Sequence, residues 1–576
     1  MKFIILDGYT DEPTCLGVPP YISTYPRYIA GAIRSLYDWE NITYLTIDQL
    51  RSKPSYRKTL SSADYLIIIA GVSVPGRYLS GYPMSHNEII SYVQPLHNTI
   101  KILCGPAARY GFGLFGGKKP RNNLYFERYF DAVVSGDCEL FLHELLSENM
   151  NINDINTNIV RSHAAQIKDF SVKGAAIVTQ HPNFPERLIT EIETYRGCTR
   201  GIHGGCSFCS EPFKGIVDFR DQKDILSEIQ ALYEYGIKHI RLGNQPCIFS
   251  YKAHQATQQP FPRPNPQELH RLFSKLRVKA PNLETIHIDN ANPGIIAKYP
   301  DEARKIAEII IKYHTPGDVA AFGVESVDPI VIKENNLKAT SEEVLSAIEI
   351  LNEMGRERGE NGMPELLPGL NFLFGLKGET KKTYQLNYDF LKQIIEKNLW
   401  IRRINIRKVI PLPNTPLDTL GNKIIRKHTR TFSQFKTNVK EHIERPLLKK
   451  MMPIGTILSN VITEKQDGNT MFSRQMGSYP LLIGVKGIFQ SSITLRVIIT
   501  DHGYRSLTAL PYPLPINTAS RTMLEALPGI GSKRAARILT SRPFANEKEF
   551  LIAIDDESIG KKIIPFLCFN TKTTTE

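Results

Sequence analysis

The feature that most constrains this fold is an alternation of short apolar segments with amphipathic stretches over residues 185–415. Strand-like segments occupy 186–194, 238–243, 285–290, 319–325, 369–375 and 404–412. Helical periodicity occupies 224–236, 268–280, 302–314, 341–355 and 384–398. About six repeated strand–helix units favour a full or partial (β/α)6 barrel, in which chemistry lies on the loops after the strand C-termini.

Residues 1–150 show the same alternation with a shorter period. The strand-like segments are 2–7, 41–47, 64–74, 99–105 and 131–137, with helical stretches at 25–39 and 87–96. This pattern predicts a doubly wound parallel sheet. No GxGxxG follows the first strand, so an ordinary dinucleotide fingerprint is missing. The polar, poorly periodic segment 151–184 is expected to be a linker.

The pattern changes after residue 415. Residues 416–452 read as a basic helical connector, 453–515 as a small β-barrel with Gly, Asp and Asn turns, and 516–576 as a helical tail. The connector's basic residues are Lys423, Arg426, Lys427, Arg430, Lys436, Lys440, Arg445, Lys449 and Lys450. Because 576 residues exceed what one hydrophobic core supports, the chain is predicted to be a multidomain α/β protein.

Charge and apolar patterning limit the partners and the compartment. The formal charge of +13 favours a polyanionic partner, with nucleic acid first and a membrane surface second. The strongest apolar run, 65–74, is far shorter than the ~20 residues of a membrane helix. Eight scattered cysteines do not form a disulfide framework. We therefore expect a cytoplasmic protein with no membrane partner.

Three of the eight cysteines, Cys198, Cys206 and Cys209, fall within twelve residues that follow the first barrel strand. Thiolates hold iron–sulfur clusters, and three ligands leave one iron of a 4Fe–4S cluster open. Nearby glycines allow a tight loop around such a cluster. Structural zinc is the alternative, because His203 would complete a Cys₃His set.

This cysteine segment and two later motifs resemble the radical S-adenosylmethionine (SAM) superfamily. The shared features are the CSFC pair, FGVES at 322–326 and GLKGET at 375–380, where Lys377 replaces a proline. The resemblance implies a 4Fe–4S cluster on the three cysteines that binds and reduces SAM, releasing a 5′-deoxyadenosyl radical. Seven residues separate Cys198 from Cys206, whereas the superfamily usually has three.

The resemblance also implies contacts to SAM. Glu325 and Ser326 would hydrogen-bond its ribose or amino-acid end. At 241–246, RLGNQP stands where Gly-Gly-Glu is common; Gly243 fits, but no Glu follows, so backbone carbonyls would contact the ammonium group. His287, Asp289 and Asn290 are further candidates, with a structural strand-end cluster as the alternative. The implied cofactor-binding residues are Phe208, Gly243, Asn244, Asn290, Gly323, Glu325 and Ser326.

The flanking regions resemble known modules more loosely. Residues 1–150 resemble a cobalamin-binding-like domain through 19–35 and Gly136–Glu139, but the cobalt-ligating Asp-x-His-x-x-Gly is absent. We therefore expect a substrate or architectural role rather than cobalamin binding. Residues 453–515 resemble a TRAM domain. The tail resembles a helix–hairpin–helix module, in which Gly529, Gly531, Ser532, Lys533 and Arg534 would contact phosphates.

The leading hypothesis is a radical SAM enzyme that modifies RNA, in particular tRNA, gripped by residues 420–576. An electron donor such as ferredoxin or flavodoxin is implied. The alternatives are a radical SAM enzyme acting on a protein or small molecule, with the tail as a docking module, and a non-catalytic zinc protein that binds nucleic acid. Cys15, Cys104 and Cys138 would hold a second cluster only if the fold brought them together, which the strand position of Cys104 disfavours.

Overall fold

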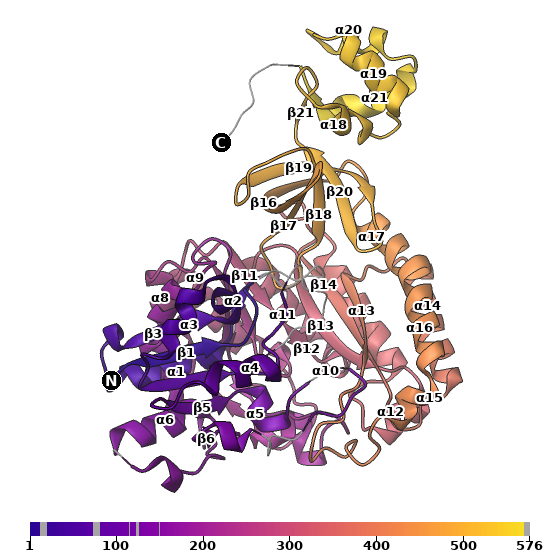
Figure 1. Ribbon diagram of the computed structural model, residues 1–576. Coiled ribbons are helices and arrows are strands. Elements are labelled where there is room, and N and C mark those ends of the chain that lie inside the picture. The colour runs from indigo at the N-terminus through magenta and orange to yellow at the C-terminus, as the bar shows by residue number, and fades with distance from the viewer. Residues whose placement is uncertain (12–19, 73–80, 114–115, 122–125, 149, 570–576) are drawn as a thin grey trace.

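The computed structural model describes residues 1–11, 20–72, 81–113, 116–121, 126–148 and 150–569. Its N-terminal domain is built on a parallel sheet of order β3-β1-β4-β5-β6 (Figure 1). The strands are β1 Phe3–Asp7, β3 Ile42–Thr46, β4 Tyr65–Ile69, β5 Ile100–Cys104 and β6 Ala132–Val133. Alternate residues of β1 enter different cores: Phe3 and Ile5 pack toward the rest of the protein, and Ile4 and Leu6 pack the other way. This two-sided burial explains the continuous apolar runs in the sequence.

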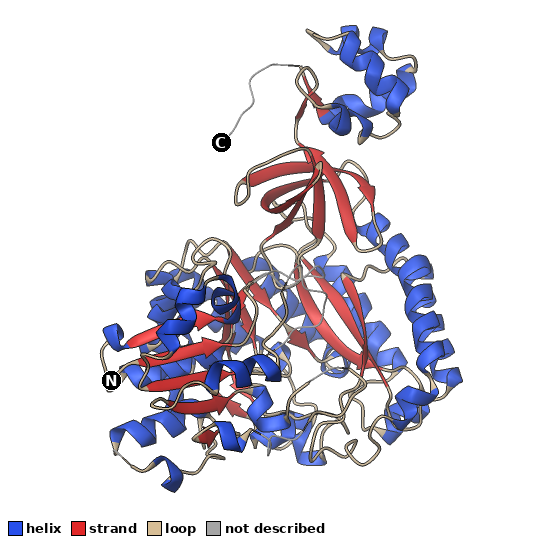
Figure 2. Ribbon diagram, viewed as in Figure 1, coloured by secondary structure: helices blue, strands red, loops and turns tan. Residues whose placement is uncertain are grey.

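Helices cover this sheet, as the blue ribbons around its strands show (Figure 2). They are α1 Thr24–Arg34, α2 Ile47–Ser52, α3 Pro54–Leu60, α4 His86–Val93, α5 Pro106–Tyr110 and α6 Cys138–Ser147. The segment expected as a linker holds α7 Lys168–Lys173 and short 3₁₀ turns. Its Phe170, Ile177 and Val178 are buried, so it packs between the domains instead of spanning open space.

The central region is a partial barrel of parallel strands in two four-stranded sheets, ordered β11-β10-β7-β2 and β12-β13-β14-β15. The strands are β2 Tyr21–Ile22, β7 Ile189–Glu193, β10 His239–Gly243, β11 Thr285–Ile288, β12 Asn290–Ala291, β13 Asp318–Glu325, β14 Leu366–Phe374 and β15 Arg403–Lys408. The sheets meet beside Asp289, whose carbonyl accepts a hydrogen bond from the Ala321 amide at 2.9 Å. The N-terminal segment adds β2 to the edge at β7. The six predicted barrel strands are therefore present, in an incomplete barrel.

Helices pack on the outside of the barrel strands. They are α8 Gln222–Glu234, α9 Pro266–Lys279, α10 Pro293–Lys298, α11 Pro300–Tyr313, α12 Pro329–Glu334, α13 Ser341–Gly355 and α14 Lys381–Glu396. Alternate strand residues such as Ile240, Phe322 and Ile404 pack into this helical layer. The intervening residues face the barrel interior, which we call the lumen. The lumen is polar and holds the residues described below.

A helical connector leads to the C-terminal part (orange and yellow in Figure 1). The connector consists of α15 Lys423–Lys427, α16 Thr429–Val439, a π-helical turn Lys440–Glu444 and α17 Arg445–Met451. A closed five-stranded barrel follows, with β16 Ile457–Asp467, β17 Thr470–Gln475, β18 Leu482–Lys486, β19 Thr494–His502 and β20 Ser506–Pro511. The tail contains α18 Arg521–Glu525, α19 Ser532–Thr540, α20 Glu547–Ala553 and α21 Glu557–Ile563, with the short strands β21 Leu514–Pro515 and β22 Leu567–Cys568. The predicted fold class is confirmed.

Candidate active site

The cysteine loop follows the short strand β8 Tyr195–Arg196. Gly197 has a φ of 79°, and a Cβ there would lie 2.8 Å from the carbonyl oxygen of Ile216, so only glycine fits this turn. Cys198 then caps a 3₁₀ turn, Thr199–His203. Cys206 and Cys209 share a second turn, in which the Cys209 amide donates to the Cys206 carbonyl at 3.0 Å. Local glycine and turn geometry thus bring the three thiols to one side of the loop.

Arg200 and Asn336 brace this loop against the segment after α12. The Arg200 guanidinium donates to the Cys206 Sγ at 3.1 Å and to the carbonyl oxygens of Asn336 and Leu337 at 2.6 and 3.2 Å. The Asn336 side-chain amide in turn donates to the carbonyl oxygens of His203 and Gly205 at 3.1 and 2.7 Å. These reciprocal contacts fix the loop to the segment after α12 and leave the thiols facing the lumen.

The three cysteines line a cavity of about 210 Å³ at the C-terminal end of the barrel strands. Four of the predicted cofactor-binding residues, Phe208, Asn290, Gly323 and Glu325, line the same cavity. Further lining residues include Tyr195, Cys247, Asn292, Lys338 and Asn371. The structure therefore brings the cysteines and the end of β13 together at one site.

The other three predicted cofactor-binding residues lie outside the cavity wall. Gly243 ends β10, where a Cβ would lie 2.7 Å from an Oε atom of Glu191. The Asn244 amide donates to Glu193 at 3.0 Å. The Ser326 hydroxyl accepts from the Asp328 amide at 3.2 Å and is buried, so here it stabilises the turn after β13.

Lys338 and Glu325 form the charged part of the cavity. Glu325 ends β13 with a φ of 62°, a left-handed conformation that is costly for a residue with a side chain. Burial raises the pKa of Glu325, while Lys338 and Arg407 act in the opposite direction. Burial by itself would lower the pKa of Lys338, but Glu325 and the cysteine sulfurs raise it above its usual value. Lys338 therefore stays cationic beside the three thiols.

The donor set fits an iron–sulfur cluster held at three corners. Burial raises the pKa of Cys198, and it raises that of Cys209 to about 12, so a bound metal is needed to keep these sulfurs deprotonated. Among the residues that the structure describes, no three His, Cys, Asp or Glu side chains converge on a single metal ion. His203 is exposed, and its described contact is through its carbonyl oxygen. The three thiols around one cavity match a multi-iron cluster better than a Cys₃His zinc site.

Two cysteines of the N-terminal domain also come together. Cys104 ends β5, Cys138 begins α6, and both are buried. A hydrogen bond between them adds to burial in raising the pKa of Cys138 well above its usual value. Cys15, the third residue of the hypothetical second set, lies outside the described residues.

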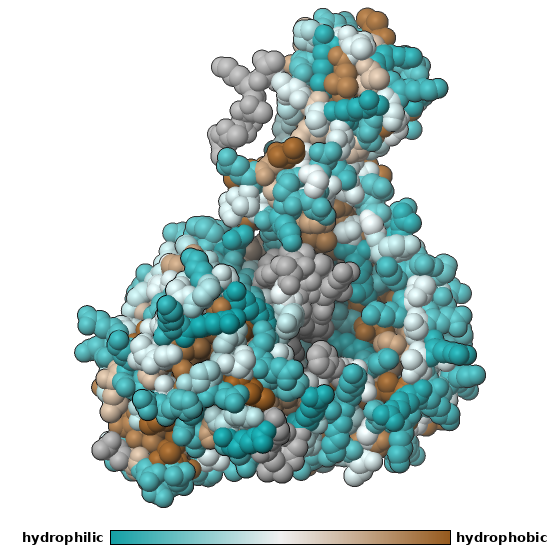
Figure 3. Space-filling model, viewed as in Figure 1, coloured by the Kyte–Doolittle hydropathy of each residue, from teal (hydrophilic) through white to brown (hydrophobic). Residues whose placement is uncertain are grey.

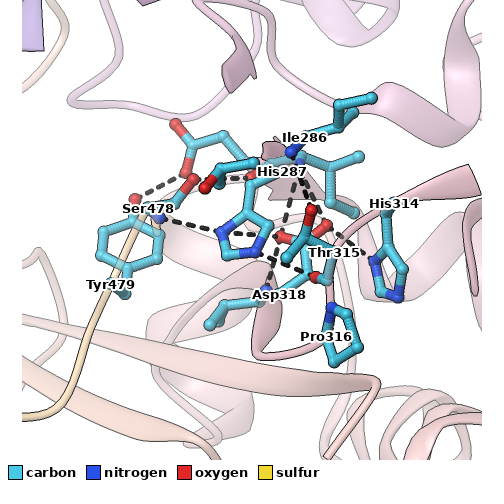
Figure 4. A network of polar contacts seen from close by, with 12 residues as sticks. Ile286, His287, His314, Thr315, Pro316, Asp318, Ser478 and Tyr479 are labelled. Carbon is cyan, nitrogen blue, oxygen red and sulfur yellow. Dashed lines mark hydrogen bonds and ion pairs between the residues drawn. The ribbon is translucent and has the colours of Figure 1, made fainter. Parts of the chain in front are cut away.

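The strand-end residues His287 and Asp289 contact a loop of the C-terminal barrel (Figure 4). The Ser478 amide donates to Nδ1 of His287 at 2.9 Å, and the Tyr479 hydroxyl donates to Asp289 at 2.5 Å. A Cβ at Gly477 would lie 2.7 Å from the His287 ring, so the approach is close. Loop 476–481 therefore packs directly against the core strands. In this structure both residues serve tertiary packing.

The tail residues expected to contact phosphate are arranged in a helical hairpin between α18 and α19. Gly529 has a φ of 79° and packs against Ile559, and Gly531 precedes α19. Ser532 and Lys533 open α19 and are exposed. The Arg534 side chain, however, pairs with Asp555 at 2.7 Å and donates to the Gly529 carbonyl at 2.9 Å. Arg534 thus links the two halves of the tail.

Sequence reasoning missed Lys338, Asn371 and Cys247. Lys338 follows Asn335 and Asn336 in the NNLK segment, and its position after a G-x-E-S strand was the available signal. Asn371 lies in the middle of an apolar strand, where a lone polar residue marks the lumen face. Cys247 is buried, and its sulfur accepts from the Asn292 amide at 3.2 Å. Nothing in its sequence surroundings indicates the cavity.

Comparison with known proteins agrees with this geometry. Residues 192–391 match the radical SAM superfamily, and the chain belongs to that superfamily. It is also similar to two archaeal proteins over most of its length. An uncharacterized protein of Methanocaldococcus jannaschii is 46% identical, over 88% of this chain and 92% of its own. One from Archaeoglobus fulgidus is 40% identical over 98% of both chains.

More distant matches have assigned names. The ribosomal protein uS12 methylthiotransferase RimO of Carboxydothermus hydrogenoformans is 21% identical, over 57% of this chain and 70% of its own. A tRNA-2-methylthio-N(6)-dimethylallyladenosine synthase of Protochlamydia amoebophila is 25% identical, over 35% and 40%. The solved structure of the radical SAM methyltransferase TsrM from Kitasatospora setae aligns with a TM-score of 0.49 and 14% identity, over 72% of this chain and 74% of that one. At this TM-score and identity, no ligand of that protein is inferred for this chain.

Proposed function

We propose that this radical SAM enzyme modifies RNA, with tRNA as its substrate class. The observation that carries the proposal is the helical part of the connector, 420–452, because all nine of its Lys and Arg side chains are exposed whereas its only acidic residues are Glu441 and Glu444. Glu444 is buried against Arg505, which leaves Glu441 as the one exposed carboxylate of 420–452. A helical surface of this charge binds phosphates. On the face shown in Figure 3, the connector side and the tail are largely hydrophilic.

The cavity would hold SAM next to a 4Fe–4S cluster on Cys198, Cys206 and Cys209. Such a cluster supplies the electron that cleaves the sulfonium of SAM. Lys338 lines the cavity together with the three cysteines, whereas Arg200 is already engaged by carbonyl oxygens, so we assign Lys338 to the SAM carboxylate. We assign Glu325 and Asn290, which also line the cavity, to the ribose and ammonium groups of SAM. Arg200 donates a hydrogen bond to the Cys206 sulfur, which stabilises negative charge there.

The named distant relatives are consistent with an RNA substrate, but they do not decide between RNA and protein. One acts on a tRNA adenosine and one on a ribosomal protein, according to their names. The exposed cations of the connector and the helical hairpin at Gly529–Ser532 favour the nucleic acid. A ferredoxin or flavodoxin is the proposed electron donor.

The test uses the full-length, anaerobically reconstituted protein and in vitro-transcribed tRNA. We expect binding that weakens by about 10³-fold or more between 50 and 200 mM salt if about six phosphates are contacted. Replacing Lys423, Lys427 and Lys436 with Gln should lower the slope of log K against log salt by about one per lost contact. The matched control replaces the exposed Lys275, Lys279 and Lys305, on α9 and α11, with Gln.

The activity arm adds SAM and dithionite, then digests the tRNA and compares nucleoside masses. A new modified nucleoside that depends on Cys206 would support the proposal. Salt-insensitive or absent tRNA binding, together with SAM cleavage that tRNA does not stimulate, would reject RNA as the substrate. The alternative, a protein or small-molecule substrate, would then take its place.

A further inference from the structure

The lumen face of β15 carries two arginines beside the active-site cavity. Ile404 and Ile406 pack into the helical layer, so Arg403, Asn405 and Arg407 face the other way. The Asn405 side chain donates to Asn371 at 2.7 Å, and Asn371 lines the cavity. Arg403 and Arg407 therefore lie on the two sides of Asn405, which contacts the cavity wall through Asn371, and they are separated along the strand by about 13 Å.

The neighbouring strand shows where Arg403 lies. Gly369 of β14 stands opposite Arg403, and a Cβ at Gly369 would be 2.8 Å from the Arg403 Cγ. The arginine stem thus crosses β14 at a position that only glycine leaves open. Its guanidinium lies 3.8 Å above the Tyr479 ring. Arg407 stands opposite Leu373, near the mouth of the cavity, and its side chain is exposed.

These arginines lack carboxylate partners. Within the described part of the chain, no ion pair joins Arg402, Arg403 or Arg407 to an acidic residue. Nη1 of Arg403 and Nε of Arg402 are buried without a hydrogen-bond acceptor. Burial and the neighbouring cation lower the pKa of Arg402 to about 9. A buried guanidinium nitrogen without an acceptor is costly, so an anion at Nη1 of Arg403 would stabilise this residue.

The acidic groups of the lumen offset these charges only in part: Asp289 attracts both lumen arginines and Glu325 attracts Arg407, but burial still lowers the pKa of each arginine. Arg241 is paired with Glu191 at 2.7 Å. Asp289 accepts the Tyr479 hydroxyl, and Glu325 faces Lys338. The three cations Lys338, Arg403 and Arg407 still outnumber the two carboxylates Asp289 and Glu325.

We propose that Arg403 and Arg407 bind the phosphate groups on the two sides of the substrate nucleotide and so hold that nucleotide against the cavity. The inference rests on the proposed RNA substrate and adds its point of entry. Planar guanidinium groups pair with phosphate oxygens in bidentate fashion. β15 is the edge strand of its sheet, and Arg505, paired with the connector's Glu444, donates to the Ile404 carbonyl at 2.9 Å. These contacts place the connector beside β15, so RNA bound to the connector would lie close to the lumen arginines.

The test measures calorimetric binding of the four ribonucleoside 3′,5′-bisphosphates to the full-length holoprotein. These probes carry both flanking phosphates yet are too small to span the connector. We expect at least one bisphosphate to bind, its parent nucleoside to bind at least tenfold more weakly, and Arg403→Met and Arg407→Met to weaken the bisphosphate at least tenfold. Arg271→Met, an exposed arginine of α9, is the control. Melting temperature and iron content verify that each variant is folded.

Equal affinity of wild type and both variants, or no bisphosphate binding at all, would overturn the proposal. Displacement of the bisphosphate by SAM would assign the arginines to SAM instead. Stronger binding of succinate than of the bisphosphates would indicate a carboxylate substrate and also overturn it. Because none of these probes reaches the connector, a bisphosphate site can be present even if tRNA binding fails.

Discussion

The hydroxyl of Tyr479, on a loop of the C-terminal barrel, donates a 2.5 Å hydrogen bond to Asp289, at the end of a core strand 190 residues earlier. The backbone carbonyl of Tyr479 also accepts from Arg402 at 2.7 Å. Together with the contact of Ser478 to His287, these bonds attach the small barrel to the core strands (Figure 4). The C-terminal barrel is therefore packed directly on the core barrel, and it is also a candidate RNA-binding module.

Tyr479→Phe removes the donor and leaves the Asp289 carboxylate buried with one hydrogen bond fewer. We expect a loss of about 1–3 kcal/mol in the free energy of unfolding, measured by chemical denaturation. Tyr235→Phe, at an exposed position after α8, should change stability by less than about 0.5 kcal/mol. Equal stability of both variants would show that the Tyr479–Asp289 bond contributes nothing to folding.

Cys198→Ala, Cys206→Ala and Cys209→Ala should each lower bound iron and abolish 5′-deoxyadenosine formation from SAM and dithionite, since three thiolates are needed to hold the cluster. Cys568→Ala, which changes a half-buried cysteine in the tail, should leave both unchanged. Iron and sulfide analysis with chromatography of the nucleoside gives both readouts. Full activity in any of the three variants would remove that residue from the ligand set.

Lys338→Met should weaken SAM binding at least tenfold without removing the cluster, because the amine lines the cavity, where it would pair with the SAM carboxylate. Lys338→Arg should retain part of the affinity. Lys333→Met, on the exposed side of α12, is the control. SAM affinity is measured by equilibrium binding to the oxidised protein. An unchanged affinity in Lys338→Met would assign the carboxylate to another cation.

His314 should make stability depend on pH. Burial lowers its pKa, but Asp318 and Glu365, at 3.2 and 3.1 Å, raise it above the usual 6.5 in the folded protein. Its stabilising contribution is therefore complete below pH 6.5 and is lost as the pH rises through the folded-state pKa. Relative to His314→Gln, the wild type should lose up to about 1.4 kcal/mol of unfolding free energy per pH unit in that window. Parallel stability curves for both proteins would contradict the assignment.

The sequence by itself determined the order of the domains, the strand–helix alternation and the loop that holds Cys198, Cys206 and Cys209. These features depend on local periodicity and on glycines such as Gly197, whose turn is set by neighbouring residues. Short-range patterns also indicated the small barrel and the exposed charge of the connector. No pattern indicated that the expected linker packs against the sheet, since its few apolar residues are irregularly spaced.

Only the tertiary structure decided which side chains share the cavity. Lys338 and Cys247 reach the thiols from different loops, and Tyr479 reaches Asp289 from another domain. Ser326 and Arg534, candidates for cofactor and phosphate contacts, were engaged by Asp328 and Asp555 instead. Such pairings join residues far apart in the chain, or turn a side chain away from its expected face. Local sequence does not encode them, because their energies depend on burial and on partners that the fold alone brings together.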